Sequence, residues 1–151
     1  MQVYFSLGSN LGSRRANIEK ALNLMSEAFG KPFEKLSDLI ETRSWGFDGP
    51  DFLNAAVCYD LDINPEDAEK EGLRILGICK GIERDLGRVC EAEFDGSGQR
   101  IYKSRPIDID ILLMGDCRID HPLLKVPHPL MTRRDLVMLP LGQIRELPVC
   151  D

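Results

Sequence analysis

The chain has 151 residues, a length typical of one domain, and it is long enough to bury a core without disulfide or metal cross-links. Its hydrophobic fraction of 43% and charged fraction of 29% exclude a disordered or collagen-like chain, and no apolar run approaches the ~18 residues of a membrane-spanning helix. Acidic residues outnumber basic ones by 25 to 19, for a net charge of -6, so a general nucleic-acid-binding surface is not expected.

The cysteines indicate a reducing compartment. There are five, at positions 58, 79, 90, 117 and 150, and none has the CxxC spacing of a zinc or redox site. Cys58 and Cys79 fall at apolar positions, which predicts packing roles. The first residues lack the basic region and long apolar stretch of a secretory signal. We expect a soluble, cytoplasmic monomer with a single domain over residues 1–151, no fused second domain, and no membrane or nucleic-acid partner.

In chain order, the first half of the sequence predicts a strand, a helix and two further strands. Residues 2–7 alternate in hydropathy as a strand does. Helical spacing runs from Ile18 to Phe29, between an N-cap at Ser13 and a stop at Gly30. Strands are predicted over residues 34–42 and 52–63, on either side of a turn-rich loop at residues 46–50.

The second half predicts a helix and a final strand. The helix begins at residues 64–67, which supply a cap, a proline at the first position and an acidic first turn, and it ends at Gly87. Residues 107–114 form the clearest strand, and Gly115-Asp116 is expected to turn it into a hairpin partner at residues 117–119. The whole order predicts an α+β fold, a ferredoxin-like sandwich with a mainly antiparallel sheet covered by helices.

The sharpest chemical signal is the pair Asp108 and Asp110. Residues i and i+2 of a strand share one face, so the two carboxylates point together. Alternate residues from Ile107 to Leu113 fill the opposite face with apolar side chains, and residues 112 and 114 continue the face of the aspartates, as in a central strand. Two carboxylates in an apolar frame would repel each other and lose hydration unless a cation or hydrogen-bond donors met them. Mg²⁺ suits such oxygens, since it takes one or two protein carboxylates with water and phosphate oxygens.

The alternative for this pair is a solvated strand end with ordinary ion pairs. The sequence contains a comparison, because Asp60 and Asp62 also share a face. They lie where a strand runs into a turn, and for them we favour the ordinary interpretation. The apolar frame around Asp108 and Asp110 favours metal binding there.

Basic residues precede the acidic strand. Arg88, Arg100, Lys103 and Arg105 lie within or beside residues 89–104, a stretch with little apolar patterning. A loop of that length in a compact domain is often a lid, and arginines on it would close over phosphates. Arg105, beside the aspartates, is the strongest candidate. Arg100 and Lys103 are read equally well as solvated surface charges.

Three other features are weaker. His128 is held between prolines and could donate to a phosphate, although a lone loop histidine is more often incidental. Residues 8–10 lack the spacing of a nucleotide-binding loop and predict a turn and a helix cap. Trp45 and Phe47, in a loop rich in glycine and proline, fit either aromatic walls for a flat ligand or ordinary loop packing.

Together these features resemble a known family, the 6-hydroxymethyl-7,8-dihydropterin pyrophosphokinases of folate biosynthesis. The resemblance covers nearly the whole chain, from about Val3 to Leu141, and its specificity lies in the order of motifs that are weak one by one. The residues that carry it are Gly8-Ser9-Asn10-Leu11-Gly12, Thr42 with Trp45-Gly46-Phe47, Phe52-Leu53-Asn54-Ala55, Ile82-Glu83 with Gly87-Arg88, Arg105 with Asp108-Ile109-Asp110-Ile111-Leu112, and Pro127-His128-Pro129 with Met131, Arg134 and Leu139-Pro140-Leu141.

The resemblance implies an enzyme that transfers pyrophosphate from ATP to the hydroxymethyl group of the pterin and leaves AMP. In such enzymes two Mg²⁺ ions are held by the aspartates that match Asp108 and Asp110, and Arg88 and Arg105 complete the expected catalytic set. The implied ATP contacts are Arg88, Lys103, Arg105, His128 and Arg134. The implied pterin contacts are Asn10, Thr42, Ser44, Trp45, Gly46, Phe52, Asn54 and Leu136. Loops around residues 10–12, 43–50 and 89–104 would close over both substrates.

Two positions depart from the family pattern. Cys90 stands where an arginine is frequent, so Lys103 or Arg100 is expected to supply the missing charge. Leu136 stands where an aromatic residue is expected, which leaves the pterin with Phe52 on one face and an aliphatic side chain on the other.

Two alternatives stand beside the resemblance. A two-metal nucleotidyltransferase also uses a Gly-Ser turn and an Asp-x-Asp strand, but with a much shorter separation between them. A non-catalytic ferredoxin-like ligand-binding module, with solvated aspartates, is the alternative from another class.

Overall fold

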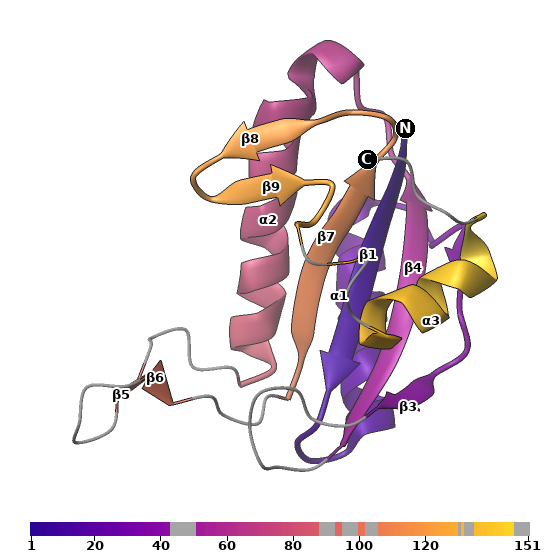
Figure 1. Cartoon of the computed structure of the whole chain (residues 1–151), viewed down its shortest axis with the longest axis vertical. Helices are drawn as coiled ribbons and strands as arrows, with labels where there is room; N and C mark the ends of the chain where they lie inside the picture. The colour runs from indigo at the N-terminus through magenta and orange to yellow at the C-terminus, as the bar shows by residue number, and fades with distance from the viewer. Residues whose placement is uncertain are drawn as a thin grey trace.

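The computed structural model describes residues 1–42, 51–87, 93–94, 100–101, 106–129, 131 and 135–146 (Figure 1). Its main sheet, within these ranges, has five strands in the order β2-β4-β1-β7, and β3 also pairs with β4. These strands are β1 (Gln2–Ser9), β2 (Lys35–Leu36), β3 (Ile40–Thr42), β4 (Phe52–Asp60) and β7 (Asp108–Met114). All four pairings are antiparallel, and the fold is α+β, as predicted.

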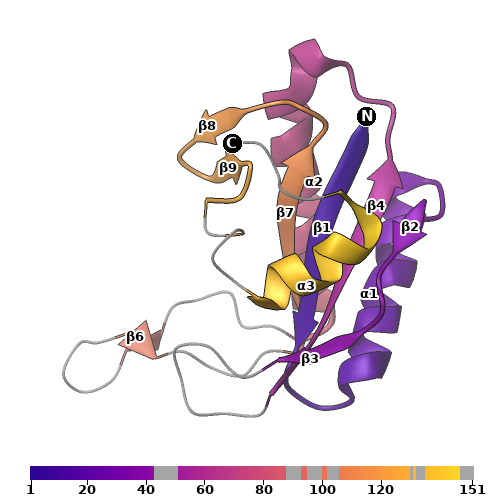
Figure 2. The ribbon, with the colours of Figure 1, turned by 45° about the vertical axis from the view of Figure 1, so that its right-hand side comes forward.

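Two long helices cover one face of this sheet (Figures 1 and 2). They are α1 (Arg14–Phe29) and α2 (Ala68–Asp85), the second preceded by the 3-10 turn η1 (Pro65–Asp67). Their apolar stripes pack on alternate residues of β1, Val3, Phe5 and Leu7, which are fully buried. Gly30 ends α1 with φ of 73°, a left-handed conformation that glycine adopts without strain. Both helices were predicted from the spacing of their apolar residues.

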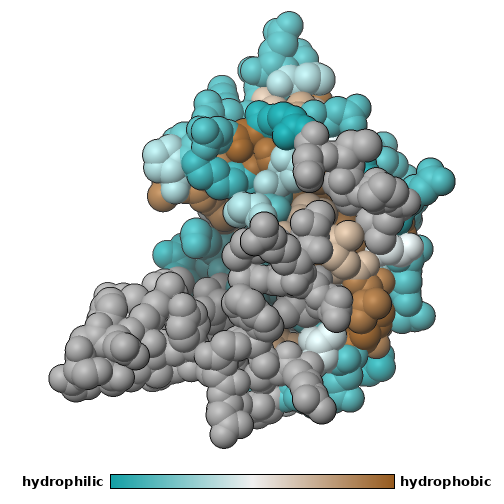
Figure 3. Space-filling view, viewed as in Figure 1, coloured by the Kyte–Doolittle hydropathy of each residue, from teal (hydrophilic) through white to brown (hydrophobic). Residues whose placement is uncertain are grey.

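The helix α3 (Asp135–Ile144) lies on the opposite face of the sheet (Figure 2) and was not predicted. Pro140 is inside it, and proline removes a helical hydrogen bond, so the sequence alone does not favour a helix here. Packing stabilises it: Val137 and Leu141 join Tyr4 and Cys58 of the sheet in a second core cluster. Leu139 is 53% exposed, and Figure 3 shows apolar surface over α3.

Two local predictions differ from the structure. The strand expected over residues 34–42 is divided into β2 and β3, because the side chain of Ser37 accepts the N–H of Ala56 at 2.8 Å between them. The hairpin expected after residue 114 is wrong: β8 (Ile119–His121) pairs instead with β9 (Leu124–Val126). Ile119 and Leu124 reach α2 at Gly72, where a β-carbon would lie 2.8 Å from Leu124 Cδ2. Docking on the helix therefore selects the partner strand.

The strand β7 lies at the edge of the sheet, whereas the sequence predicts a central strand. Its outer edge is covered, since Leu112 O accepts the N–H of His128 at 3.0 Å. Its register with β1 shifts at a bulge, so Leu112 and Leu113 both face the second cluster and Met114 returns to the first. The faces predicted for Leu113 and Met114 are therefore wrong, while those of Ile109, Ile111 and Leu112 are confirmed.

Three smaller findings complete the fold. Within the expected loop over residues 89–104, β5 (Glu93–Phe94) pairs with β6 (Arg100–Ile101). Cys58 and Cys79 are buried free thiols, as predicted. In the described part of the chain, each helix is too short or too polar to cross a bilayer.

Candidate functional site

A row of three residues crosses the sheet where β1 ends and where β4 and β7 begin. Gly8 of β1 pairs with Asn54 on one side and with Asp108 on the other. In the next row, Ser6 pairs with Ala56 and Asp110. Directly opposite residues point to the same face, and two strand spacings separate the Asn54 and Asp108 backbones by ~10 Å. The predicted metal pair and a predicted pterin contact thus share one face and one end of the sheet.

Asp108 and Asp110 are both partly buried, and they lie on the same face of β7, as the alternation predicts. The side chain of Ile109, between them, points into the core on the other face and is 4% exposed. Within the described ranges, no cluster of three or more His, Cys, Asp or Glu side chains could hold a metal. A pair of carboxylates on one face of a strand is the kind of donor set that Mg²⁺ uses when phosphate and water oxygens complete its coordination shell.

Glu83 of α2 supports this strand from the helix side. It is only 3% exposed, and its Oε2 accepts the N–H of Ile109 at 2.9 Å. Burial raises the pKa of the nearby Cys79 thiol, and the charges of Glu83 and Asp110 raise it further, so Cys79 stays protonated. Glu83 belongs to one of the motifs that resemble the family, but the sequence does not predict its contact with β7. One sequence feature could have indicated a role for Glu83: it lies four places after Cys79 and therefore on the buried stripe of the helix.

Asn54 presents a buried amide at the end of the sheet. Its Nδ2 donates to Thr42 Oγ1 at 2.6 Å and to the carbonyl oxygen of Ile40 at 3.2 Å. A carbonyl can only accept, so this contact fixes which end of the amide faces β3. The Oδ1 atom is buried and has no hydrogen-bond partner among the described residues. An unsatisfied buried carbonyl costs ~1–3 kcal/mol, which a ligand donor would recover.

Gly8 provides the space for this arrangement. A β-carbon at Gly8 would lie 3.2 Å from Asn54 Oδ1 and 3.4 Å from Phe52 Cδ1. Phe52 is partly buried at the start of β4 and pairs with Thr42 of β3. Glycine thus lets a polar atom and an aromatic ring lie close over the end of β1.

The turn between β1 and α1 carries Asn10, another predicted pterin contact. Asn10 is 1% exposed, and Gly12 makes the turn with φ of 68°. The side chain of Asn17 in α1 donates to the carbonyl oxygen of Leu11 at 2.9 Å and so ties the turn to the helix. Ser13 occupies the N-cap position, although its side chain makes no capping hydrogen bond within the described residues.

The backbone of His128 lies along the outer edge of β7. Its backbone N–H bonds to Leu112, two residues beyond Asp110, and its side chain is partly buried. The structure therefore places Asp108 and Asp110 on β7, with the backbone of His128 beside that strand. It places Asn10, Thr42, Phe52 and Asn54 at the adjoining strand ends. The predicted residues that lie outside the described ranges are Ser44, Trp45, Gly46, Arg88, Lys103, Arg105 and Arg134. Of Leu136, in α3, only the backbone is described.

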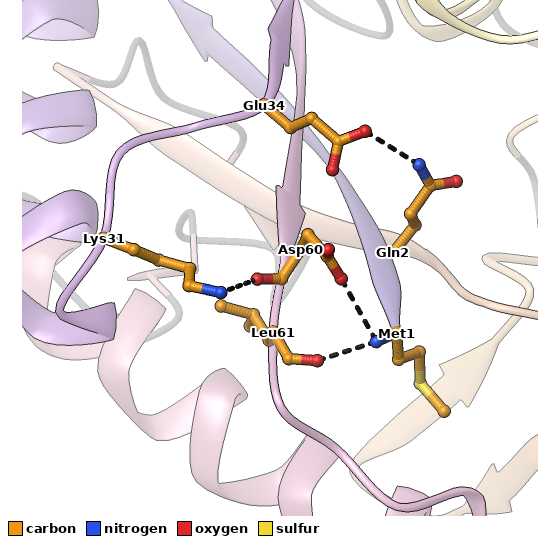
Figure 4. Close-up of polar contacts among 6 residues, drawn as sticks. All are labelled: Met1, Gln2, Lys31, Glu34, Asp60 and Leu61. Atoms are coloured by element: carbon orange, nitrogen blue, oxygen red, sulfur yellow. Dashed lines mark hydrogen bonds and ion pairs between the residues drawn. The ribbon is translucent and has the colours of Figure 1, made fainter.

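The comparison pair Asp60 and Asp62 behaves as the ordinary interpretation predicts. Asp60 Oδ1 accepts from the Met1 ammonium group at 3.3 Å, and its backbone carbonyl accepts from Lys31, as Figure 4 shows. Asp62 is exposed. The pair lies at the opposite end of β4 from Asn54, in a setting of surface ion pairs.

Comparisons with known proteins identify the family of the chain. The model of the 7,8-dihydro-6-hydroxymethylpterin-pyrophosphokinase family matches residues 4–146. The chain is 41% identical over 144 residues to the 2-amino-4-hydroxy-6-hydroxymethyldihydropteridine pyrophosphokinase of Porphyromonas gingivalis, covering 94% of this chain and 89% of the relative. It is 36% identical over 143 residues to the protein of the same name from Aquifex aeolicus, covering 94% and 79%.

A plant relative shows similarity over part of its length. The mitochondrial folate synthesis bifunctional protein of Pisum sativum is 37% identical over 141 residues, which are 93% of this chain and 24% of the plant protein. The family match spans nearly the whole chain, and the bacterial relatives are covered over most of their length. This chain therefore belongs to the 7,8-dihydro-6-hydroxymethylpterin-pyrophosphokinase family, whose members are diphosphotransferases of folate biosynthesis.

Proposed function

We propose that this protein transfers the terminal pyrophosphoryl unit of ATP to the hydroxymethyl group of 6-hydroxymethyl-7,8-dihydropterin, giving AMP and the pterin diphosphate. The observation that carries the proposal is the buried Oδ1 of Asn54, which lacks a partner among the described residues. A pterin carries amino and ring N–H donors along one edge, and a fixed buried acceptor would select that edge. Family membership supports the same substrate.

The side chains around Asn54 suit a flat heterocycle. Phe52 offers an aromatic ring close to Gly8, where a β-carbon would lie 3.4 Å from Phe52 Cδ1. Thr42 Oγ1 holds the Asn54 amide in one orientation at 2.6 Å. A mostly apolar site with a few fixed polar groups is typical of small-molecule recognition.

The carboxylates of Asp108 and Asp110 would hold Mg²⁺ together with phosphate oxygens of ATP. When bound, the metal would neutralise the charge of the triphosphate and orient it for in-line displacement. The two aspartates lie one strand away from Gly8 and two from Asn54, so nucleotide and pterin would meet over the end of β1. His128 would donate to phosphate from the outer edge of β7, and the basic residues of the 88–105 segment and Arg134 would add contacts to ATP.

The test is product analysis with Mg-ATP and 6-hydroxymethyl-7,8-dihydropterin. AMP that appears in step with the pterin diphosphate would support the proposal, whereas ADP would indicate γ-phosphoryl transfer and contradict it. Mg²⁺-dependent nucleotide binding without turnover would favour the ligand-binding module. Asp60→Asn is the matched control for Asp108→Asn, because it removes a carboxylate of the same sheet at the opposite end.

A further inference from the structure

We infer that Arg14 is a positioning residue for pterin binding, an inference that rests on the proposed function. Arg14 is the first residue of α1, and its guanidinium group contacts two separate segments. Nη2 lies 2.6 Å from Glu41 Oε1 of β3, and Nη1 donates to the carbonyl oxygen of Asp51 at 3.0 Å. One side chain thus connects the start of α1, the end of β3 and the start of β4.

The two partners of Arg14 lie next to predicted pterin contacts. Glu41 directly precedes Thr42, and Asp51 directly precedes Phe52. Thr42 and Phe52 face each other across the β3–β4 pairing, at the two ends of the chain segment 43–51. By holding Glu41 and Asp51, the guanidinium group therefore fixes the distance between Thr42 and Phe52.

Arg14 also follows the turn that carries Asn10, so its backbone is connected to that turn while its side chain contacts the residues before Thr42 and Phe52. A displacement of β3 would move Thr42 Oγ1, which accepts from Asn54 Nδ2 and keeps Oδ1 directed away from β3. Arg14 would thus influence pterin affinity without touching the pterin. Its influence on the carboxylate pair of β7 would be much smaller, because β1 separates β7 from β4.

The contact geometry calls for arginine specifically. Two acceptors in different directions match the planar fork of a guanidinium group, whereas one ammonium group of lysine cannot reproduce both contacts. The side chains of Arg14 and Glu41 are 32% and 58% exposed, and ion pairs with that exposure add little to overall stability. The effect of losing Arg14 is therefore expected in substrate affinity more than in the melting temperature.

The primary experiment compares Arg14→Gln with Arg15→Gln. Arg15 is the next residue of the same helix and is exposed, so its variant changes the net charge equally. We expect Arg14→Gln to raise the KM for the pterin by about three- to tenfold at saturating Mg-ATP, while the KM for ATP stays within about twofold. Arg15→Gln is expected to leave both values unchanged. Equal increases in the two KM values, or equal effects of the two variants, would overturn the inference.

Two further variants test whether the effect of Arg14 depends on its contacts with both acceptors. Glu41→Gln retains the contact to Asp51, so its effect should be smaller, and adding it to Arg14→Gln should raise the pterin KM no further. Arg14→Lys should restore only part of the affinity. Fully additive effects of Arg14→Gln and Glu41→Gln, or complete rescue by lysine, would contradict a shared two-acceptor contact.

Equilibrium binding separates this inference from the proposed function. The pterin would be titrated into each protein in the presence of Mg²⁺ and a non-hydrolysable ATP analogue. Weaker binding to Arg14→Gln than to Arg15→Gln would support the positioning role, and equal binding would contradict it. If the wild-type protein bound the pterin but released no AMP in the product assay, the proposed transfer would fail while the positioning role could still be decided here.

Discussion

Gly8 lies directly beneath the side chain of Asn54, and the two residues pair across β1 and β4. A β-carbon at Gly8 would be 3.2 Å from Asn54 Oδ1, closer than most carbon atoms approach an amide oxygen. The unpartnered, buried oxygen of the site therefore keeps its position only because residue 8 has no side chain. Adding one methyl group at position 8 therefore tests the proposed site.

Gly8→Ala is expected to weaken pterin binding. The added methyl group would press on Asn54 Oδ1, 3.2 Å away, and on the ring of Phe52, 3.4 Å away, and would shift both from their positions in the proposed site. We expect the KM for the pterin to rise by about tenfold with a smaller change in the KM for ATP, measured by steady-state kinetics. Gly77→Ala, on the outer side of α2, is the control and should change neither value. Unchanged pterin affinity in Gly8→Ala would remove Gly8 and Asn54 from the proposed site.

Asn54→Ala is expected to raise the KM for the pterin by roughly ten- to hundredfold, because a buried hydrogen-bond acceptor worth ~1–3 kcal/mol would be lost. The contacts of its Nδ2 with Ile40 and Thr42 would be lost as well, so thermal unfolding must be followed in parallel. Asn64→Ala is the control, since Asn64 is exposed and its side chain makes no capping bond within the described residues. Normal pterin kinetics in a folded Asn54→Ala protein would contradict the assignment.

Asp108→Asn and Asp110→Asn are expected to lower kcat by ~10²–10³-fold while leaving the fold intact. Each substitution keeps the size of the side chain but removes a charged ligand for Mg²⁺. The measurements are turnover as a function of Mg²⁺ concentration, with far-UV circular dichroism to verify folding. Asp60→Asn should retain full turnover, because Asp60 pairs with the Met1 ammonium group at the other end of the sheet. Near-normal activity in either site variant would overturn the metal assignment.

Local patterns were sufficient to predict much of this fold. The alternation in β1 and β7 and the helical spacing in α1 and α2 depend on neighbours within a few residues, and the structure confirms these elements. The shared face of Asp108 and Asp110 follows from the same two-residue period. The comparisons confirm the family. The roles of the site residues, which spacing does not define, come from the family resemblance and stay predictions.

What the sequence did not predict depends on contacts between distant residues. The pairing of β8 with β9 follows from their docking at Gly72, and α3 forms despite Pro140 because it covers the second cluster. The contacts of Glu83 with β7 and of Arg14 with β3 span 26 and 27 residues of the chain, respectively (109 minus 83, and 41 minus 14). No local pattern marks such partners in advance.

Glu83→Met and Glu83→Gln are expected to differ. Glutamine retains an oxygen that can accept the N–H of Ile109, whereas methionine leaves that buried N–H without this partner, at a cost of ~1–3 kcal/mol. Since Ile109 lies between the two aspartates, Glu83→Met should also raise the Mg²⁺ concentration needed for half-maximal turnover. Urea unfolding and Mg²⁺ titrations would be measured on both proteins. Equal Mg²⁺ requirements in wild type and Glu83→Met would show that Glu83 serves stability alone.

Substitution by alanine is expected to change the stability of the protein in opposite directions at two glycines of α2. Gly77 is exposed and no described atom lies within 4 Å of an added β-carbon, so Gly77→Ala should stabilise the protein by up to ~1 kcal/mol through helix propensity. At Gly72 the β-carbon would lie 2.8 Å from Leu124 and 3.1 Å from both Ile119 and Met114. The propensity gain is the same there, but overpacking of ~1–3 kcal/mol should outweigh it.

The Gly72→Ala substitution also tests how α2 influences the proposed nucleotide site. Leu124 begins β9, and His128 follows the end of that strand by two residues, so a displaced hairpin would move His128 relative to β7. We therefore expect Gly72→Ala to raise the KM for ATP more than the KM for the pterin, the reverse of Gly8→Ala. Denaturant unfolding would give the stability of both glycine variants, and steady-state kinetics would give the two KM values. If Gly72→Ala lowered stability but left the KM for ATP unchanged, the hairpin would act as a structural support and His128 would be positioned by β7 alone.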